Sequence, residues 1–183
     1  MTTAAVVLAA GASRRLGRAK QTVEIGGETL LERAVRVAGE AGLKPVIVVV
    51  REAGLAEGLR GCEVMVNEQA EEGMASSIRC GVRKAEELGA AGLVMMACDQ
   101  VLLRAEHLRE LCVEAGRVTG SGYAGKVGIP AYFPAEKFDE LIALRGDVGA
   151  RELLRLAVAV ADEGLALDVD TEADLARAEV RLR

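Results

Sequence analysis

The sequence predicts an α/β protein in which helices cover both faces of a mostly parallel sheet, giving three layers. The first observation is that apolar runs typical of strands alternate along the chain with amphipathic segments typical of helices. The second is that the runs at 6–8, 45–50 and 93–97 are unbroken, as in strands buried on both faces. The third is length, because 183 residues suffice for one domain with a core, 1–183, and are too few to expect two.

The first half of the chain shows this alternation clearly. The strand at 6–8 stops at Gly11, and Thr29 followed by Glu32 has the form of a capping box before a helix. Gly39, Gly42 and Pro45 mark the end of that helix, and a second strand covers 45–50. A short segment at 55–59 then leads to a strand at 63–66 and a helix at 74–88.

The second half starts with a strand at 93–97 and a helix at 105–115, followed by a Gly-rich span at 116–128 that has no assignment. A strand is expected at 131–133, and helices at 138–144 and 148–156 with Asp147 as the N-cap of the second. Alternation at 165–170 predicts a strand with Asp168 and Asp170 on one face, and Thr171 caps a last helix to Leu182. Ligands of such a sheet lie at the carboxyl ends of its strands.

Composition excludes several classes of function. A net charge of -5 and an aromatic content of 2% argue against nucleic-acid binding, which requires a basic face or stacking aromatics. No apolar run approaches the ~18 residues of a membrane span. The four cysteines are widely spaced and there is one histidine, His107, which we expect at the surface. This pattern argues against zinc and favours reduced thiols in a cytoplasmic protein.

A basic loop follows the first strand. No carboxylate occurs before Glu24, whereas four cationic side chains fall within 14–20: Arg14, Arg15, Arg18 and Lys20. Such a cluster of donors after a strand predicts a phosphate site.

Two common phosphate-binding motifs do not fit this loop. A P-loop would need its lysine nearer to Gly11 and a Ser or Thr in place of Gln21. The dinucleotide fingerprint would need glycines where Ser13 and Leu16 stand. The remaining alternative without a ligand is a solvent-exposed basic turn.

What does fit, at every position from Leu8 to Lys20, is Leu-Ala-Ala-Gly-x-Ser-x-Arg-x-Gly-x-x-Lys. This segment resembles the signature of the nucleotidyltransferases of molybdenum cofactor synthesis, and segments at 26–32, 72–77, 128–130, 146–151 and 168–171 extend the likeness over nearly the whole chain. Together they are similar to the cytidylyltransferase branch. Val101 and Ile129 depart from the family pattern. The resemblance implies a Rossmann-like sheet of the nucleotide-diphospho-sugar transferase type.

The resemblance also implies a set of site residues. Catalytic residues would be Arg15, Lys20 and Asp99. Nucleotide-binding residues would be Leu8, Ala9, Ala10, Gly11, Ser13, Arg15, Lys20, Gly73, Ser76 and Ser77. Acceptor-binding residues would be Gln100, Gly128, Pro130, Asp147 and Arg151. Some of these residues could instead have a purely structural role, with Ser76 or Ser77 as a helix cap and Arg151 as a surface charge.

A metal site is expected around Asp99. This carboxylate closes a buried strand, where it is costly unless it is paired or bound to a cation. Its partner should be Asp168 or Asp170, and the resemblance indicates Asp170. Hard oxygen ligands of this kind suit Mg²⁺.

The expected reaction is transfer of CMP from CTP to the phosphate of a molybdopterin-type cofactor, with release of diphosphate. The guanylyl branch typically has glycine where Ala10 stands, so the Ala10 methyl group would favour the smaller base. A molybdoenzyme or its chaperone would be a transient partner. Two alternatives stay open: a nucleotidyltransferase using GTP or another acceptor such as a sugar phosphate, and a cofactor-binding module without catalysis.

Overall fold

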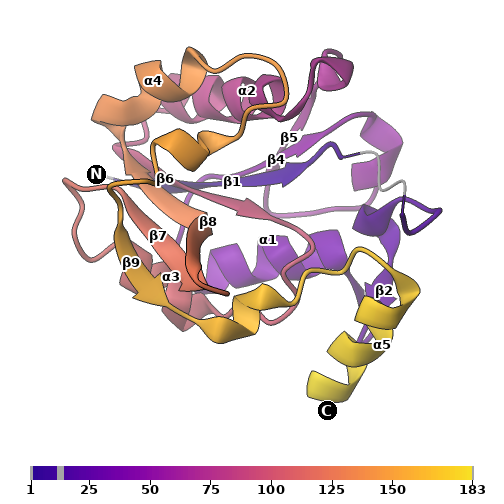
Figure 1. The fold of residues 1–183 in the computed structure, drawn as a ribbon. Helices are drawn as coiled ribbons and strands as arrows, with labels where there is room; N and C mark the ends of the chain where they lie inside the picture. Colours follow the sequence, from indigo (N-terminus) through magenta and orange to yellow (C-terminus); the bar gives the residue numbers. More distant parts are fainter. Residues whose placement is uncertain (1, 12–14, 183) are drawn as a thin grey trace.

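The computed structural model describes residues 2–11 and 15–182, and within them a seven-stranded sheet has the order β5-β4-β1-β6-β8-β7-β9 (Figure 1). Its strands are β1 (Thr3–Ala9), β4 (Val46–Val50), β5 (Glu63–Val66), β6 (Gly92–Ala97), β7 (Thr119–Tyr123), β8 (Lys126–Pro134) and β9 (Val158–Ala161). Strands β5, β4, β1 and β6 are parallel, β8 is antiparallel to β6 and β7, and β9 is parallel to β7. The predicted mostly parallel sheet is confirmed.

Unbroken apolar sequence places the central strands in the interior. Every side chain of β4 is buried, and β1 and β6 are nearly as enclosed. Because such strands expose neither face to water, helices must cover both. The predicted strands at 6–8, 63–66 and 93–97 lie within observed strands, and the one predicted at 45–50 begins one residue before β4.

Helices α2 (Met74–Glu87) and α4 (Phe138–Ile142) cover one face, and α1 (Leu30–Glu40) and α3 (Ala105–Leu111) cover the other. Figure 1 shows α2 and α4 above the sheet and α1 below it. Each face has its own apolar core, and the three predicted layers are confirmed. That residues 1–183 form one domain stays a prediction.

Two of the three predicted helix caps, Thr29 and Thr171, are confirmed. Thr29 accepts from the backbone N–H of Glu32 over 3.1 Å, and Glu32 accepts in return from the backbone of Thr29 over 2.7 Å. Thr171 begins α5 (Glu172–Arg181) in the same way, with Asp174 as its partner. Helix α5 packs beside the hairpin formed by β2 (Glu24–Ile25) and β3 (Glu28–Thr29). Figure 1 shows α5 next to β2.

In a third apolar cluster, residues of α5 pack against residues of the hairpin and of the basic loop. This cluster consists of Leu16, Val23, Ile25, Leu30, Val101, Val169, Leu175 and Ala178. The first loop and the last helix are therefore packed together, although they lie at opposite ends of the described chain.

The Gly-rich span is part of the sheet. It contains β7 and the start of β8, where glycines are needed for space. A Cβ on Gly120 would lie 2.6 Å from Cγ1 of Val127, and one on Gly128 would lie 2.7 Å from the hydroxyl of Tyr123. The sequence analysis left this span without an assignment, and the structure shows that its glycines permit close packing within a hairpin.

Three predicted elements are wrong or too long. The helix at 148–156 is only a 3₁₀ turn, Ala150–Glu152, because the chain turns to pair β9 with β7 and leaves Leu156 exposed. The strand at 165–170 is a 3₁₀ turn, Glu163–Ala166, followed by irregular backbone, since Leu165 and Val169 enter different cores. Helix α3 ends at Leu111, before the predicted residue 115.

The predicted surface position of His107 is also wrong. His107 is 2% exposed, and its Nε2 lies 2.7 Å from the hydroxyl of Ser121 on β7. It falls on the same face of α3 as Leu108 and Leu111, whereas its charged sequence neighbours lie on the other face. Burial lowers the pKa of His107, which favours the neutral ring.

The four cysteines are free thiols, as predicted. Burial raises the pKa of Cys98 to about 12 and that of Cys112 to about 11, which keeps both thiols protonated. Among the described residues no helix is both long and apolar enough to cross a membrane. Cytoplasmic location stays a prediction.

Candidate functional site

A cleft of about 560 Å³ opens at the carboxyl ends of β1, β4 and β6. Its lining comes from the loop after β1, from Arg51 after β4, from the start of α2, and from the end of β6. The full set is Leu8, Ala9, Ala10, Gly11, Lys20, Gln21, Arg51, Ala70, Glu71, Glu72, Gly73, Met74, Ser77, Ala97, Cys98, Asp99, Ile129 and Asp147. The cleft lies where ligands of parallel sheets bind.

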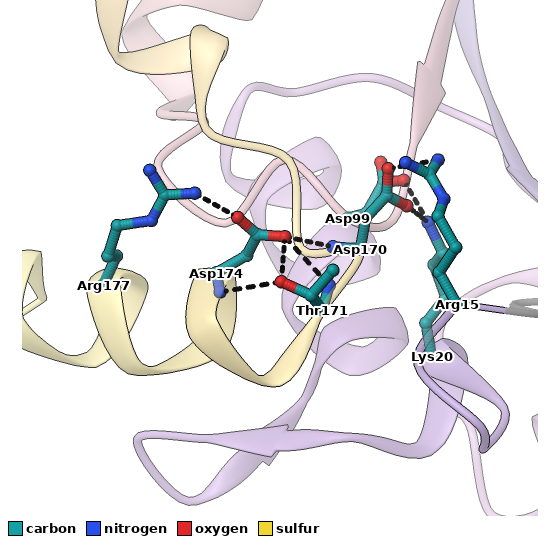
Figure 2. Close-up of polar contacts among 7 residues, drawn as sticks. All are labelled: Arg15, Lys20, Asp99, Asp170, Thr171, Asp174 and Arg177. Atoms are coloured by element: carbon teal, nitrogen blue, oxygen red, sulfur yellow. Dashed lines mark hydrogen bonds and ion pairs between the residues drawn. The ribbon is translucent and has the colours of Figure 1, made fainter.

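One end of the cleft contains a compact charge cluster. The ammonium group of Lys20 lies 2.6 Å from Oδ2 of Asp99 and 2.8 Å from Oδ1 of Asp170 (Figure 2). Burial acts to lower the pKa of Lys20, but the charge of Asp99 and hydrogen bonds to both carboxylates outweigh it and raise the pKa above its ordinary value. Lys20 is therefore a permanent cation between two carboxylates.

Two arginines of the basic loop form further ion pairs, one of them with Asp170. Arg15 lies 2.6 Å from Oδ2 of Asp170, and Arg18 pairs with Glu172 at the start of α5 over 2.9 Å. Arg15 is mostly exposed, whereas Lys20 is mostly enclosed. A polyanion entering the cleft thus meets two cations whose present partners are exchangeable carboxylates.

The loop is braced to β1 from within. Gln21, which is buried, donates from Nε2 to the carbonyl oxygens of Ala9 and Gly11, the latter over 3.3 Å. This side chain fixes the end of the strand against the 3₁₀ turn Lys20–Thr22. Sequence reasoning assigned no role to Gln21, although a polar residue directly after the lysine of the loop could have indicated one.

Two carboxylates and a cation between them suit a divalent metal site. Asp99 and Asp170 supply hard oxygen donors, and the ammonium of Lys20 shows that a positive charge fits between them. In residues 2–11 and 15–182 no group of three or more His, Cys, Asp or Glu side chains converges to hold an ion. The remaining ligands of a hexacoordinate metal would thus be water and substrate oxygens.

Asp168 lies close to this pair without joining it. Burial, followed by the charges of Asp99 and Asp170, raises the pKa of Asp168 to about 6. Its Oδ1 is enclosed and accepts no hydrogen bond from the described residues. Asp170, and not Asp168, is the residue that shares Lys20 with Asp99.

The other end of the cleft is formed by the turn before α2. Gly73 has φ of +118°, and a Cβ there would lie 2.7 Å from the Cα of Asp147. Asp147 accepts from the backbone N–H of Met74 over 3.3 Å, and Ala75 donates to the carbonyl oxygen of Gly146 over 3.1 Å. Asp147 thus caps α2, not the helix at 148–156 that the sequence predicted.

The serines of this turn have different environments. Ser77 lines the cleft, whereas the hydroxyl of Ser76 donates to the carbonyl oxygen of Gly73 over 2.8 Å. Buried Asn67 donates to both hydroxyls, over 2.8 Å and 3.0 Å. Neither serine is the N-cap residue of α2, which is Gly73.

An ion pair joins the two loops at this end. Arg79 on α2 pairs with Glu72 and also donates to the carbonyl oxygen of Leu144 over 2.9 Å. Glu72 accepts from the backbone of Gly146 over 3.1 Å, and the bond from Arg79 is the main cause that lowers the pKa of Glu72 to about 2. Sequence reasoning missed Arg79, because an arginine within a helix gives no signal of burial.

The structure thus brings most predicted residues together, but not all. Leu8, Ala9, Ala10, Gly11, Lys20, Gly73, Ser77, Asp99 and Asp147 line the cleft, and Arg15 and Asp170 adjoin it. Ser76, Gln100, Gly128, Pro130 and Arg151 are outside its lining. Ser13 lies outside the described residues.

Gln100 and Arg151 have contrasting surroundings. Gln100 is buried and donates to the carbonyl oxygen of Ile129 over 3.0 Å, which lies on the cleft wall. Arg151 is exposed on the 3₁₀ turn Ala150–Glu152. Arg51 and Glu71, an ion pair of 2.5 Å on the cleft lining, were not predicted; basic residues directly after a strand are the signal that could have found Arg51.

Comparison with known proteins gives a family match over most of the chain. Residues 5–163 match the MobA-like NTP transferase domain. A curated relative is the purine catabolism protein PucB of Bacillus subtilis (strain 168), which is 33% identical over 94% of this chain and 94% of its own length.

Among solved structures, Rv0371c from Mycobacterium tuberculosis H37Rv superposes with a TM-score of 0.84 at 32% identity, covering 98% of this chain and 99% of that one. A second structure of Rv0371c, a complex with manganese, gives a TM-score of 0.80 at 29% identity over 98% and 99% of the two chains. The shared fold extends beyond residue 163 to α5.

Proposed function

The chain belongs to the MobA-like NTP transferase family, a family of nucleotidyltransferases, and on that premise we propose that it transfers CMP from CTP to the phosphate of a molybdopterin-type cofactor. The observation that carries this proposal is Lys20 between Asp99 and Asp170, with Arg15 beside them, at one end of a nucleotide-sized cleft. A manganese complex of a relative supports a divalent metal, for which we propose Mg²⁺.

The reaction needs no base from the protein. A phosphate monoester has a second pKa near ~6, so its oxygen is already nucleophilic at neutral pH. His107 is buried against Ser121 and does not line the cleft, so we assign it no part in proton transfer. In the proposed step the acceptor oxygen forms a bond to the α-phosphorus of CTP. The bond from that phosphorus to the bridging oxygen breaks, and its electron pair leaves with diphosphate.

The protein would contribute position and charge. Arg15 and Lys20 would exchange their carboxylate partners for the β- and γ-phosphates and stabilise the departing diphosphate. Asp99 and Asp170 would hold Mg²⁺, which when bound neutralises charge that develops on the phosphate oxygens. Leu8, Ala9, Ala10 and Gly11 would line the path of the nucleotide, and the nucleotide-binding role of Ser13, which lies outside the described residues, stays a prediction.

The base would lie toward α2. Gly73 and Ser77 are at that end of the cleft, and Ala10, the residue after β1, also lines the cleft. We propose that the methyl group of Ala10 disfavours the larger purine. Ser76 does not line the cleft, and its effect on the nucleotide would be indirect. The side chain of Asn67 donates to the hydroxyls of both Ser76 and Ser77 and so links the two serines.

The acceptor would approach from the side of Ile129. Gln100, Gly128 and Pro130 lie around that wall of the cleft, where Gln100 binds the Ile129 carbonyl. Asp147 would act on the nucleotide side by capping α2, and exposed Arg151 would contact only a large acceptor. A molybdoenzyme or its chaperone would receive the product.

The decisive experiment pairs four nucleotides with candidate acceptors and measures diphosphate release and product mass. The acceptors are a molybdopterin-type cofactor, a sugar phosphate and an alcohol phosphate. We expect turnover with CTP and the molybdopterin-type cofactor. Turnover with GTP would overturn the choice of nucleotide, turnover with a sugar phosphate would overturn the choice of acceptor, and release with none would favour a non-catalytic binding module.

Two variants test the residues. Asp99→Ala should remove diphosphate release while the protein keeps its far-UV circular dichroism, whereas Asp139→Ala, an exposed aspartate on α4, should retain full activity. Ala10→Gly should shift the ratio of kcat/KM for CTP and GTP roughly tenfold toward GTP, since one methyl group contributes about that much selectivity. Retained activity in Asp99→Ala would refute its role in holding the metal.

A further inference from the structure

The two carboxylates of the charge cluster are held by different kinds of backbone. Asp99 lies two residues beyond the end of β6, whose position is fixed by ladders to β1 and β8. Asp170 lies in irregular backbone between a 3₁₀ turn and α5, and no ladder holds it. Lys20 and Arg15 contact its carboxylate, and the backbone that presents this carboxylate must be held by contacts within its own turn.

The side chain of Asp174 makes those contacts. Its Oδ2 accepts from the backbone N–H of Asp170 over 3.3 Å, and from Thr171 through the backbone N–H over 2.9 Å and the hydroxyl over 2.7 Å. Arg177, one turn further along α5, pairs with its other oxygen, Oδ1. Figure 2 shows this chain of contacts leading from Arg177 through Asp174 to the turn of Asp170.

Helix α5 itself is held by apolar packing on the side that does not contact the charge cluster. Leu175 and Ala178 are buried in the same cluster as Val169, the residue before Asp170. Val169 also donates to the carbonyl oxygen of Asp99 over 3.0 Å. The turn is thus held on one side by the end of β6 and on the other by Asp174, and Asp170 stands between these two points.

We propose that Asp174 is a positioning residue that presents the carboxylate of Asp170 to a divalent cation, and that Arg177 holds Asp174 in place. This inference rests on the proposed function, because it takes Asp170 as a metal ligand. It adds residues that lie beyond the family match at 5–163. Outer residues that orient metal ligands typically change metal affinity about 10–100-fold when they are replaced.

The test measures Mn²⁺ binding to the nucleotide-free protein by electron paramagnetic resonance, which is independent of turnover. Asp174→Ala should weaken Mn²⁺ binding about tenfold or more, because the N–H of Asp170 loses its acceptor. Asp174→Asn keeps an oxygen that accepts this hydrogen bond, and it should stay within about threefold of the unaltered protein. In turnover, Asp174→Ala should raise the KM for the metal and leave the KM for CTP unchanged.

Two control variants separate positioning from simple loss of a helix cap. Thr171→Ala removes the hydroxyl of the capping box but leaves the bond from Asp170 to Asp174, so it should lower Tm while Mn²⁺ affinity changes less than about twofold. Glu179→Ala, at an exposed position on α5, should alter neither. Equal loss of Mn²⁺ affinity in Thr171→Ala and Asp174→Ala would overturn the inference.

Asp170→Ala distinguishes failure of this inference from failure of the proposed function. If Asp170→Ala does not change Mn²⁺ affinity, the metal role of Asp170 is wrong, and the proposed function fails at that point. If Asp170→Ala abolishes Mn²⁺ binding and Asp174→Ala leaves it unchanged, Asp170 binds metal without help from Asp174, and only the inference fails.

Discussion

Val169 donates its backbone N–H to the carbonyl oxygen of Asp99 over 3.0 Å, and this bond joins the last irregular segment of the chain to the end of β6. The side chains of the residues after Asp99 and Val169 point to different environments. Gln100 turns into the interior, whereas Asp170 faces Lys20. This backbone bond, together with the contacts of Lys20 to both side chains, holds the two carboxylates of the proposed chemistry close to each other.

Replacing Lys20 separates its action on nucleotide from its action on metal. Lys20→Met should lower kcat/KM on the order of 10²-fold, because a donor to the developing charge is lost. Mn²⁺ binding to the nucleotide-free protein should stay equal or become several-fold tighter, since the ammonium no longer competes for Asp99 and Asp170. Weaker Mn²⁺ binding, measured by calorimetry, would contradict this.

Asp168 should make stability depend on pH. Its pKa is raised from 3.8 to about 6, so the folded protein binds a proton more tightly than the unfolded chain. The neutral carboxyl is favoured below pH 4, and stability falls as pH rises from about 4 to 6. Because the group is partly solvated, we expect a loss on the order of 1 kcal/mol.

Asp168→Asn should remove that loss. Urea unfolding at pH 4 and pH 7.5 should show that the variant gains on the order of 1 kcal/mol relative to the unaltered protein at the higher pH only. Asp139→Asn, at an exposed position, is the control and should show no such difference. A gain that is equal at both pH values would indicate a cause other than ionisation.

Gly73 should not tolerate a side chain. Gly73→Ala places a Cβ 2.7 Å from the Cα of Asp147 at φ +118°, which should cost about 2–4 kcal/mol in the free energy of unfolding. Gly39→Ala is a matched control on α1, where a Cβ meets nothing within 4 Å. That change should stabilise the protein by about 0.5–1 kcal/mol in urea unfolding.

Arg79 should affect nucleotide affinity without touching nucleotide. Arg79→Ala releases Glu72 and the carbonyl of Leu144, which loosens both loops at the α2 end of the cleft. We expect the KM for nucleotide to rise about tenfold and kcat to change little. Arg83→Ala, exposed on the same helix, should leave both constants unaltered. A fall in kcat alone would contradict this account.

The sequence predicted the parallel part of the fold because burial on both faces leaves an unbroken apolar run, as in β4. It failed where the cause of a pattern is tertiary. The apparent alternation of Leu165 and Val169 comes from two separate cores, and the glycines at 120 and 128 serve packing within a hairpin. Neither cause has a local signature.

The candidate site was predictable to a similar extent. Lys20 and Asp99 could be proposed from a basic loop and from a carboxylate that ends a buried strand. The choice between Asp168 and Asp170 could not be made from spacing alone, because it depends on which carboxylate shares Lys20. Arg79 and Asp174 act through hydrogen bonds to backbone groups, and such bonds depend on how the segments meet in space.

The bond between Lys20 and Asp170 spans 150 positions of the chain, which has a consequence for synthesis. At about 5–20 residues per second, Lys20 is added to the chain roughly 8–30 s before Asp170. During that interval the basic loop can pair with Asp99 but lacks its second carboxylate and the apolar support of α5. A nascent chain would therefore contain the sheet strands from β1 to β8 before it contains Asp170, and the complete charge cluster would form only when the last segment of the chain has folded.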